Sequence, residues 1–193
     1  MDSAAVTLRD ANPARDEGAA FARYLAAVSP LYRIVLGRRA QDLLAKAFAK
    51  PGHDLSYERA IVAERDGAVV GMISGHPADR PLRAADGLGR RMQSLARLMA
   101  CQRWFLGRFG DGDYVIPALA VDESNRRQGI GSALIDAMEE QARAAGANRL
   151  VLNVKAGNLA ARSLYARCGM VVERAWPRIP LIPALVLRMA KTI

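Results

Sequence analysis

Apolar residues recur every three or four positions across the first quarter of the chain, which predicts helices. Asn12 and Pro13 supply an N-cap and a proline at the first helical position, and the apolar spacing continues to about Val28. Two further helical patterns cover residues 31–36 and 40–49. We therefore expect helices here, interrupted where a proline and a glycine stand between these stretches.

Shorter runs rich in β-forming residues flank this region. Residues 6–9 predict a first strand, and residues 59–64 and 68–75 predict two more. The pair Asp66-Gly67 separates the latter two runs, and an Asp-Gly pair between two such segments is typical of a tight hairpin. We therefore expect the second and third strands to form a β-hairpin.

Residues 79–112 have the least regular pattern of the chain. They carry seven Arg and three Asp, a net charge of +4, and they are too few to bury a core alone. We interpret them as a helical insertion into one domain that spans residues 1–193, with a helix from about 87 to 108. The apolar face of that helix is marked by Leu88, Met92, Leu95, Met99 and Leu106.

The second half of the chain predicts a regular succession of strands and helices. A strand over 114–121 contains Pro117, which cannot donate to a ladder, so a bulge or a parting of neighbouring strands is expected there. The elements after it are a helix over 128–145, a strand over 149–155, a helix over 158–168, and strands over 171–176 and 184–190. This order predicts an α/β fold with a partly parallel sheet.

Composition is that of an ordinary globular protein, with 51% hydrophobic and 24% charged residues. No apolar run reaches the length of a membrane span, and the first residues lack the features of a signal peptide. Cys101 and Cys168, in a chain without a signal, fit a reducing cytoplasm. The net charge of +9 is spread without a dense basic run, so we expect neither nucleic acid nor a membrane as partner.

Residues 126–132, with the sequence Arg-Arg-Gln-Gly-Ile-Gly-Ser, lie between a predicted strand and a predicted helix. Backbone N–H groups at a helix start have no intrahelical partner, and the helix dipole is positive there. Gly129 and Gly131 remove side chains that would keep an anion away. The loop therefore predicts a phosphate cradle.

Two common phosphate-binding motifs do not fit this loop. A Walker loop needs a lysine after its glycines, and none follows here. A dinucleotide-binding fingerprint needs a third glycine where Leu134 stands. It also needs an acidic residue at the end of the next strand, where the chain has Asn153-Val154-Lys155.

A third pattern does fit. Arg126-x-x-Gly129-x-Gly131 follows an apolar strand, and Asn158 and Tyr165 stand at a fixed spacing downstream. Together these motifs closely resemble the GCN5-related N-acetyltransferase (GNAT) family. The resemblance covers the order of elements along the whole chain, and its specific part runs from Val115 to Glu173.

The resemblance implies a single-domain α/β fold with a mixed, mostly antiparallel sheet whose splayed central strands are flanked by helices. It implies that acetyl-CoA binds as co-substrate in the gap between these splayed strands, and that no metal is needed. It also implies transfer of the acetyl group to a primary amine by direct attack in a ternary complex. Tyr165 would be the acid that protonates the leaving thiolate. The implied cofactor-binding residues are Leu119, Ala120, Val121, Arg126, Arg127, Gln128, Gly129, Ile130, Gly131, Ser132 and Asn158.

Each of these residues also has a structural interpretation. Tyr165 could anchor its helix to the sheet, Asn158 could be only an N-cap, and Arg126 and Arg127 could be solvated. Cys168 fits a small core residue better than a nucleophile. The amine needs a base or a water chain to remove its proton. The residues that position leaves open for that role are Glu64, His76, Asp113, Tyr114 and Glu123.

The acceptor is not encoded in these motifs. A small-molecule amine, an aminoglycoside-type antibiotic, a peptide N-terminus and a protein lysine all remain open, as does a non-catalytic acyl-CoA-binding or regulatory protein. We expect residues 31–44 and 79–112 to shape the acceptor pocket. The inserted helix could instead form a homodimer contact, since its apolar face needs a partner.

Overall fold

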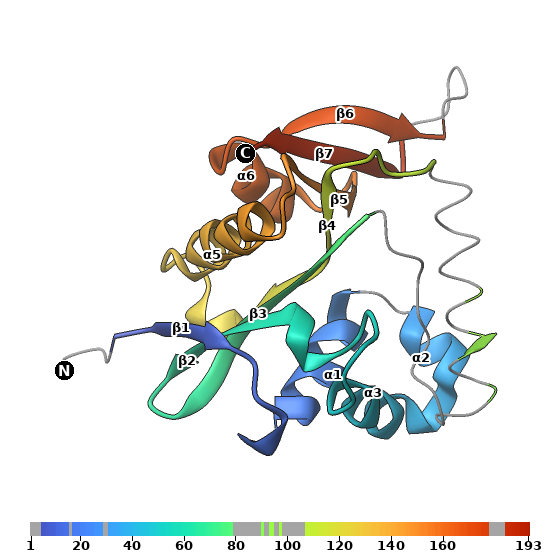
Figure 1. Cartoon of the computed structure of the whole chain (residues 1–193), viewed down its shortest axis with the longest axis vertical. Coiled ribbons are helices and arrows are strands. Elements are labelled where there is room, and N and C mark those ends of the chain that lie inside the picture. The colour runs from blue at the N-terminus through green and yellow to red at the C-terminus, as the bar shows by residue number, and fades with distance from the viewer. Residues whose placement is uncertain are drawn as a thin grey trace.

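The computed structural model describes residues 5–15, 17–28, 31–78, 90, 93–94, 97, 107–177 and 184–193. Its centre is a seven-stranded sheet in the order β1-β2-β3-β4-β5-β7-β6 (Figure 1). The strands are β1 (Thr7–Asp10), β2 (Ala60–Arg65), β3 (Ala68–Pro77), β4 (Asp113–Val121), β5 (Arg149–Lys155), β6 (Val171–Trp176) and β7 (Val186–Thr192). The β4–β5 pair is parallel and the other neighbours pair antiparallel, so the expected mixed α/β sheet is confirmed.

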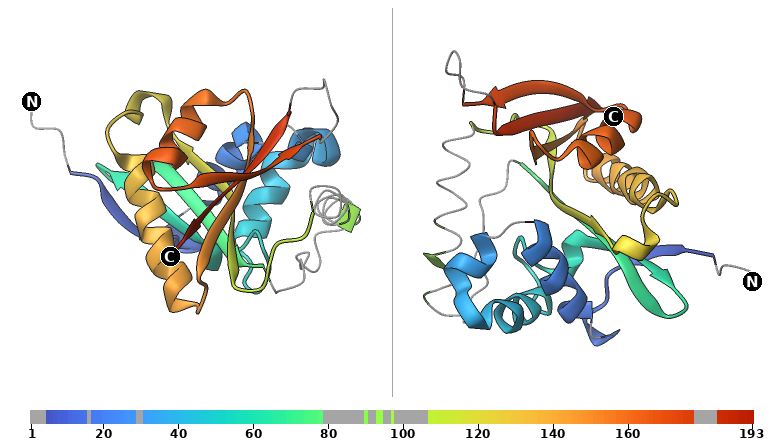
Figure 2. Two further views of the ribbon diagram at one scale, coloured as in Figure 1. Left: turned by 90° about the horizontal axis from the view of Figure 1, so that it is seen from above. Right: turned by 180° about the vertical axis from the view of Figure 1, so that it is seen from behind.

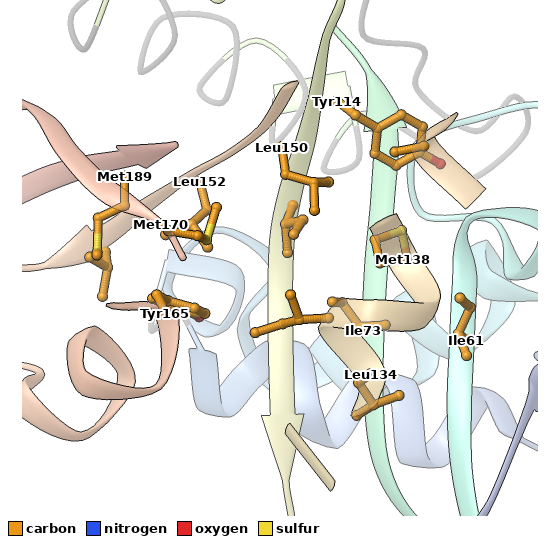
Figure 3. Close-up of a cluster of buried hydrophobic side chains, with 14 of the residues drawn as sticks. Ile61, Ile73, Tyr114, Leu134, Met138, Leu150, Leu152, Tyr165, Met170 and Met189 are labelled. Carbon is orange, nitrogen blue, oxygen red and sulfur yellow. The ribbon is translucent and has the colours of Figure 1, made fainter. Parts of the chain in front are cut away.

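Helices cover both faces of the sheet (Figure 2). The helices are α1 (Glu17–Val28), α2 (Leu31–Leu36), α3 (Ala40–Phe48), α5 (Ile130–Ala144) and α6 (Leu159–Arg167), with 3-10 turns at Pro13–Arg15, Gly37–Arg39, Tyr57–Arg59 and Glu123–Asn125. One core joins α1, α2 and α3 to the sheet around Phe21, Leu44 and Phe48. The other lies under α5, where Leu134 and Met138 pack on Ile73 (Figure 3).

Most predicted elements stand where the sequence places them. The hairpin between β2 and β3 turns at Asp66 and Gly67, which both have positive φ, as a tight two-residue turn requires. The break between α2 and α3 falls at Gly37, also with positive φ. The last strand is displaced, since β7 begins and ends two residues after the predicted 184–190.

The predicted helical insertion at 79–112 falls mostly outside the described residues. Arg90, Gln93, Ser94 and Arg97 are helical, whereas Gly107 and Arg108 are not, so the predicted helix ends before Arg108. Within the described ranges no single helix is long and apolar enough to cross a bilayer. Only α1 taken together with Tyr32–Phe48, across a 115° bend, reaches that length and composition.

A β-bulge lies in β4 at the position of Pro117. Ser74 pairs with Ala118 and His76 pairs with Val115, so Ile116 and Pro117 together oppose Gly75. The extra residue reverses the alternation of side chains along β4. Tyr114 and Ile116 face the α5 core before the bulge, and the odd-numbered residues 119 and 121 face it afterwards.

The same region is where β4 leaves β5. Their parallel ladder contains three pairs, from Asp113 with Arg149 to Val115 with Val151. Beyond Val115, β4 stays paired with β3 while β5 stays paired with β7. The sequence predicted either a bulge or a parting of strands at Pro117, and the structure contains both.

Gly75 is required by the packing opposite this bulge. A Cβ there would stand 2.5 Å from both Met138 Sδ and Tyr114 Cε1, whose side chains are almost fully buried. We predict that Gly75→Ala lowers the free energy of unfolding by about 1–3 kcal/mol, because overpacking forces neighbours off their rotamers. Urea denaturation measures this.

Gly157→Ala is the matched control, because a Cβ at Gly157 would meet nothing within 4 Å and its φ is not left-handed. We expect the control to change stability by less than about 0.5 kcal/mol. Equal stability of the two variants would contradict the packing argument.

Candidate active site

A cleft of about 720 Å³ opens where β4 and β5 part. Its walls are residues 115–121 of β4, residues 152–155 of β5, the start of α5 and one face of α6. On the other face of the sheet the cleft reaches the end of α1 and Tyr32 of α2. It therefore runs through the sheet and joins its two faces.

The backbone of β4 after the bulge presents polar groups to this cleft. The Asp122 N–H donates to the Val70 carbonyl at 2.9 Å, so the ladder to β3 continues at Ala120 and Ala118. By the antiparallel alternation, the N–H and C=O groups of Leu119 and Val121 point the opposite way. That direction leads into the gap left by β5.

The predicted cradle forms the cleft wall at the start of α5. Gly129 is the N-cap residue of this helix with φ of 82°, and Arg127 also has positive φ, at 62°. The Ala133 N–H makes the first helical bond, to the Gly129 carbonyl at 3.0 Å. Within the described chain, the backbone N–H groups from 129 to 132 donate to no protein acceptor, and the dipole of α5 makes this end positive.

Arginine side chains hold the first residues of the cradle and the turn before it by hydrogen bonds. Arg126 Nε donates to the Val121 carbonyl at 3.1 Å, which ties the loop back to β4. Arg65 of β2 donates to Asn125 Oδ1 at 2.7 Å and to Gln128 Oε1 at 2.9 Å. The Gln128 side chain is thereby engaged outside the cleft, and Gln128 is the one predicted cofactor residue that does not line it.

Asn158 and Tyr165 come to the cleft from α6. Asn158 is the N-cap of this helix, and its Oδ1 accepts from the Ala161 N–H at 3.2 Å. Tyr165, 8% exposed, lies beside Leu152 and Met170 (Figure 3). Burial raises the pKa of Tyr165 to about 12, so its hydroxyl stays protonated at neutral pH.

These features fit the phosphates and arm of a CoA thioester. A Cβ at Gly129 would meet no protein atom within 4 Å, so the glycine keeps the space in front of the amides open. Arg126 and Arg127 of the cradle line the cleft, and two further basic residues that line it are Lys155 of β5 and Arg167 at the end of α6. The hydrogen-bond donors of the cradle are therefore backbone amides and basic side chains, which suit an anionic ligand.

His76 approaches the cleft from the other face of the sheet. A Cβ at Gly75 would point towards α5, so the next side chain, His76, points towards the face that carries α1 and α2. His76 is 6% exposed and its Nδ1 lies 3.0 Å from the Pro77 carbonyl oxygen. Because a carbonyl only accepts, Nδ1 carries the proton and Nε2 is the basic nitrogen of the neutral ring.

The other candidates for a base do not line the cleft. Glu64 is held by Arg9 and Arg15, and the hydrogen bond from Arg9 lowers its pKa. Asp113 accepts from the Gly110 N–H at 2.7 Å and lies 3.4 Å from Arg149. The remaining two are Tyr114, whose hydroxyl faces the Gly75 carbonyl in the core, and Glu123, which is exposed on a 3-10 turn.

Arg188 is a residue of this region that the sequence did not reveal. It is 3% exposed and donates to the carbonyls of Gly107 and Arg108 and to Asn153 Oδ1. Its guanidinium lies over the rings of Phe109 and Trp176, at 4.2 and 5.1 Å from their centroids. Arg188 thereby fixes Phe109 and Asn153, which both line the cleft.

Comparison with known proteins gives a consistent result. The model of the Acetyltransferase (GNAT) family matches residues 28–170. No curated protein matches the chain. A crystal structure described as an acetyltransferase is 28% identical, with a TM-score of 0.68 over 96% of this chain and 98% of that one.

Two further structures share the fold at lower identity. An N-acetyltransferase from Staphylococcus aureus Mu50 is 17% identical, with a TM-score of 0.67 over 96% of this chain and 100% of that one. The putative acetyltransferase yncA from Salmonella typhimurium, solved with its cofactor acetyl-CoA, is 19% identical, with a TM-score of 0.59 over 97% and 94%.

The chain belongs to the GNAT acetyltransferase family, since the family model matches well over half of it. Acetyl-CoA is the acetyl donor of this family. Across the described residues no group of three or more His, Cys, Asp or Glu side chains is arranged to hold a metal ion.

The environment of Tyr165 gives a test of its burial. An unfolded tyrosine ionises near pH 10 and the folded one near 12, so the unfolded state gains stability as pH rises between these values. The stabilisation that the buried, neutral Tyr165 contributes to the folded state is fully present below pH 10 and is lost as the pH rises towards 12. Between pH 7 and pH 11 the free energy of unfolding should therefore fall in both proteins. We predict that it falls by about 1 kcal/mol less in Tyr165→Phe than in wild type.

Urea unfolding of both proteins at the two pH values measures this difference. Because each protein's free energy of unfolding at pH 11 is compared with its own value at pH 7, the effect of the lost hydroxyl at neutral pH cancels. An equal loss in both would show that the Tyr165 hydroxyl is not desolvated.

Proposed function

We propose that this protein is an N-acetyltransferase that moves the acetyl group of acetyl-CoA to a primary amine, by direct attack in a ternary complex. The observation that carries the proposal is the cleft at the parting of β4 and β5, with unbonded helix amides at one end and His76 at the other. It brings an anion site, a hydrogen-bonding strand edge and a proton acceptor into one continuous space.

The cradle binds the pyrophosphate of the donor. The amides of residues 129–132 point at the anion, the α5 dipole adds to the attraction, and Arg127 stands beside them. Leu119 and Val121 offer β4 backbone groups to the amides of the pantetheine arm, as an added strand would. Ala120 lines the same stretch, and Asn158 borders it from α6.

The bound thioester supplies an electrophilic carbonyl and a thiolate leaving group. The Leu119 N–H, directed into the cleft, donates to the carbonyl oxygen as negative charge develops on it. Tyr165 protonates the departing sulfur. A hydroxyl with a pKa of about 12 is a weak acid, but it is fully protonated at neutral pH and ready to donate.

His76 takes the proton of the acceptor amine. An amine with a pKa of about 10.4 is almost entirely protonated at pH 7 and cannot attack until it loses that proton. His76 is the one of the five candidates that lines the cleft, and its Nδ1–H bond to Pro77 leaves Nε2 as the basic atom. Because β3 holds it next to Val115, the base stands where the strands separate.

Binding of acetyl-CoA tests the donor half. We predict that Gly129→Ala raises the dissociation constant of acetyl-CoA about tenfold or more, because the added methyl group occupies the approach of the phosphate. Isothermal titration calorimetry with acetyl-CoA measures this constant. Wild-type protein that does not bind acetyl-CoA at saturating concentration would refute the proposed function.

Gly67→Ala is the matched control for this variant. Gly67 and Gly129 have φ of 76° and 82°, and a Cβ at either would meet nothing within 4 Å, so both variants carry the same backbone strain of about 1 kcal/mol. Gly67 lies in the β2–β3 turn, outside the cleft. Gly67→Ala should therefore lose stability and keep its affinity.

The pH dependence of kcat/KM separates the two proton-transfer roles. We predict that His76→Asn lowers kcat/KM about a hundredfold at pH 7, and that the deficit shrinks towards pH 10, where solvent deprotonates the amine. Tyr165→Phe should lower kcat by a factor that stays constant from pH 7 to 10, because the hydroxyl remains protonated throughout. Free CoA released from acetyl-CoA and an acceptor amine measures both.

Asparagine is chosen at position 76 because its side-chain N–H can replace Nδ1–H as donor to Pro77, while Nε2 is lost. A deficit in His76→Asn that is the same at every pH would show a structural role. A wild-type rate in Tyr165→Phe would exclude the acid role.

A further inference from the structure

The first residues of the cradle have little backbone hydrogen bonding of their own. The Arg126 N–H donates to the Glu123 carbonyl at 3.3 Å, and the next N–H with an acceptor is that of Ala133. Across the described chain, the N–H groups from 127 to 132 donate to no protein group. The start of a helix accounts for the free groups from 129 onward. The conformation of the loop before them therefore depends on side-chain contacts.

One residue of this loop has an unfavourable backbone conformation. Arg127 lies in the left-handed region with φ of 62°, which costs free energy for a residue that has a Cβ. Gly129, with φ of 82°, carries no such cost. A strained residue persists only where contacts around it fix the chain. The position of the free amides that follow Arg127 therefore depends on what holds the loop on each side of it.

Arg65 supplies contacts on both sides of Arg127. From the last position of β2, its guanidinium donates through Nη1 to Asn125 Oδ1 at 2.7 Å and through Nη2 to Gln128 Oε1 at 2.9 Å. Its Nε is shielded from solvent, so the guanidinium is packed against the protein. The two donors belong to one rigid, planar group, and they therefore fix the spacing of the two side chains that accept from them.

The other side-chain bonds of the loop stay within it or reach only the strand before it. Gln128 Nε2 donates to the Ser124 carbonyl at 3.2 Å, and Arg126 Nε donates to the Val121 carbonyl. Arg65 instead joins the loop to the β2–β3 hairpin, 60 positions earlier in the chain. Arg65 does not line the cleft, so any effect of its contacts on a ligand passes through the loop.

We propose that Arg65 is a positioning residue for the acetyl donor. Its two hydrogen bonds fix the loop on both sides of Arg127 and so direct the free amides of residues 129–132 at the pyrophosphate before the donor binds. This inference rests on the proposed role of the cradle in binding that pyrophosphate. A site that is already ordered loses less conformational freedom on binding, so loss of the two bonds should weaken the affinity for acetyl-CoA.

The first experiment separates the geometry of Arg65 from its charge. Arg65→Met removes both, whereas Arg65→Lys keeps the charge and lacks the planar pair of donors. By isothermal titration calorimetry, we expect the dissociation constant of acetyl-CoA to rise about tenfold in Arg65→Met and at least about fivefold in Arg65→Lys. Arg65→Lys with an affinity within about twofold of wild type would overturn the positioning role, because charge alone would then explain the effect.

Arg15→Met is the matched control for the lost charge. Arg15 is half exposed and pairs with Glu64, the residue before Arg65, and it contacts no residue of the cradle among the described ones. We expect its dissociation constant for acetyl-CoA to stay within about twofold of wild type. A loss as large as that of Arg65→Met would also overturn the inference.

The second experiment tests whether Arg65 acts through Gln128. Gln128→Met keeps the length of the side chain and removes the oxygen that accepts from Arg65. If the two residues act as one unit, the double variant with Arg65→Met should bind acetyl-CoA no more weakly than Arg65→Met alone. Effects that multiply in full in the double variant would show that the two residues act independently, against the inference.

A donor without phosphates distinguishes positioning of the cradle from a general distortion of the protein. S-acetylpantetheine has the thioester and the arm of acetyl-CoA but lacks its pyrophosphate. We expect the preference for acetyl-CoA over S-acetylpantetheine, taken as the ratio of their dissociation constants, to fall about tenfold in Arg65→Met. Equal weakening of both ligands would overturn the inference. Wild-type protein that binds both ligands equally would instead refute the proposed cradle itself.

Discussion

The parting of β4 from β5 is the constraint on which the rest of this structure depends. A parallel pair that continued along the full length of both strands would satisfy every backbone group and leave no space between them. Here Pro117 removes one donor, and the bulge at Ile116 and Pro117 turns β4 so that its side chains change faces. The edges of β4 and β5 beyond this point are thereby available to a ligand.

Because the gap lies in the middle of the sheet, the two faces meet in it. The α5 face supplies the cradle, and α6 supplies Asn158 and Tyr165. The other face supplies His76 and Tyr32. Tyr165 and His76, the proposed proton donor and proton acceptor, therefore approach the same space from opposite sides, which suits a reaction in which one molecule enters from each face.

The sequence by itself determined the local elements and the loop that we propose as the donor half of the site. Helical spacing, the Asp66-Gly67 turn, the N-caps and Pro117 act through neighbours in the chain, so their signals are complete within a few residues. The cradle is equally local, since residues 126–132 form the loop and the start of α5 together. For this reason the family resemblance predicted the anion site at a loop and helix start that the structure forms.

Only the tertiary structure decided the acceptor half. His76 was one of five candidates in sequence, and the register of β3 against β4 brings it to the point of separation while Glu64 and Asp113 are engaged elsewhere. Arg188 and Phe109 are 79 positions apart along the chain and meet because β7 pairs with β5 beside the lead into β4. Such contacts join residues that are distant in sequence, and no local pattern of residues encodes which of them will meet.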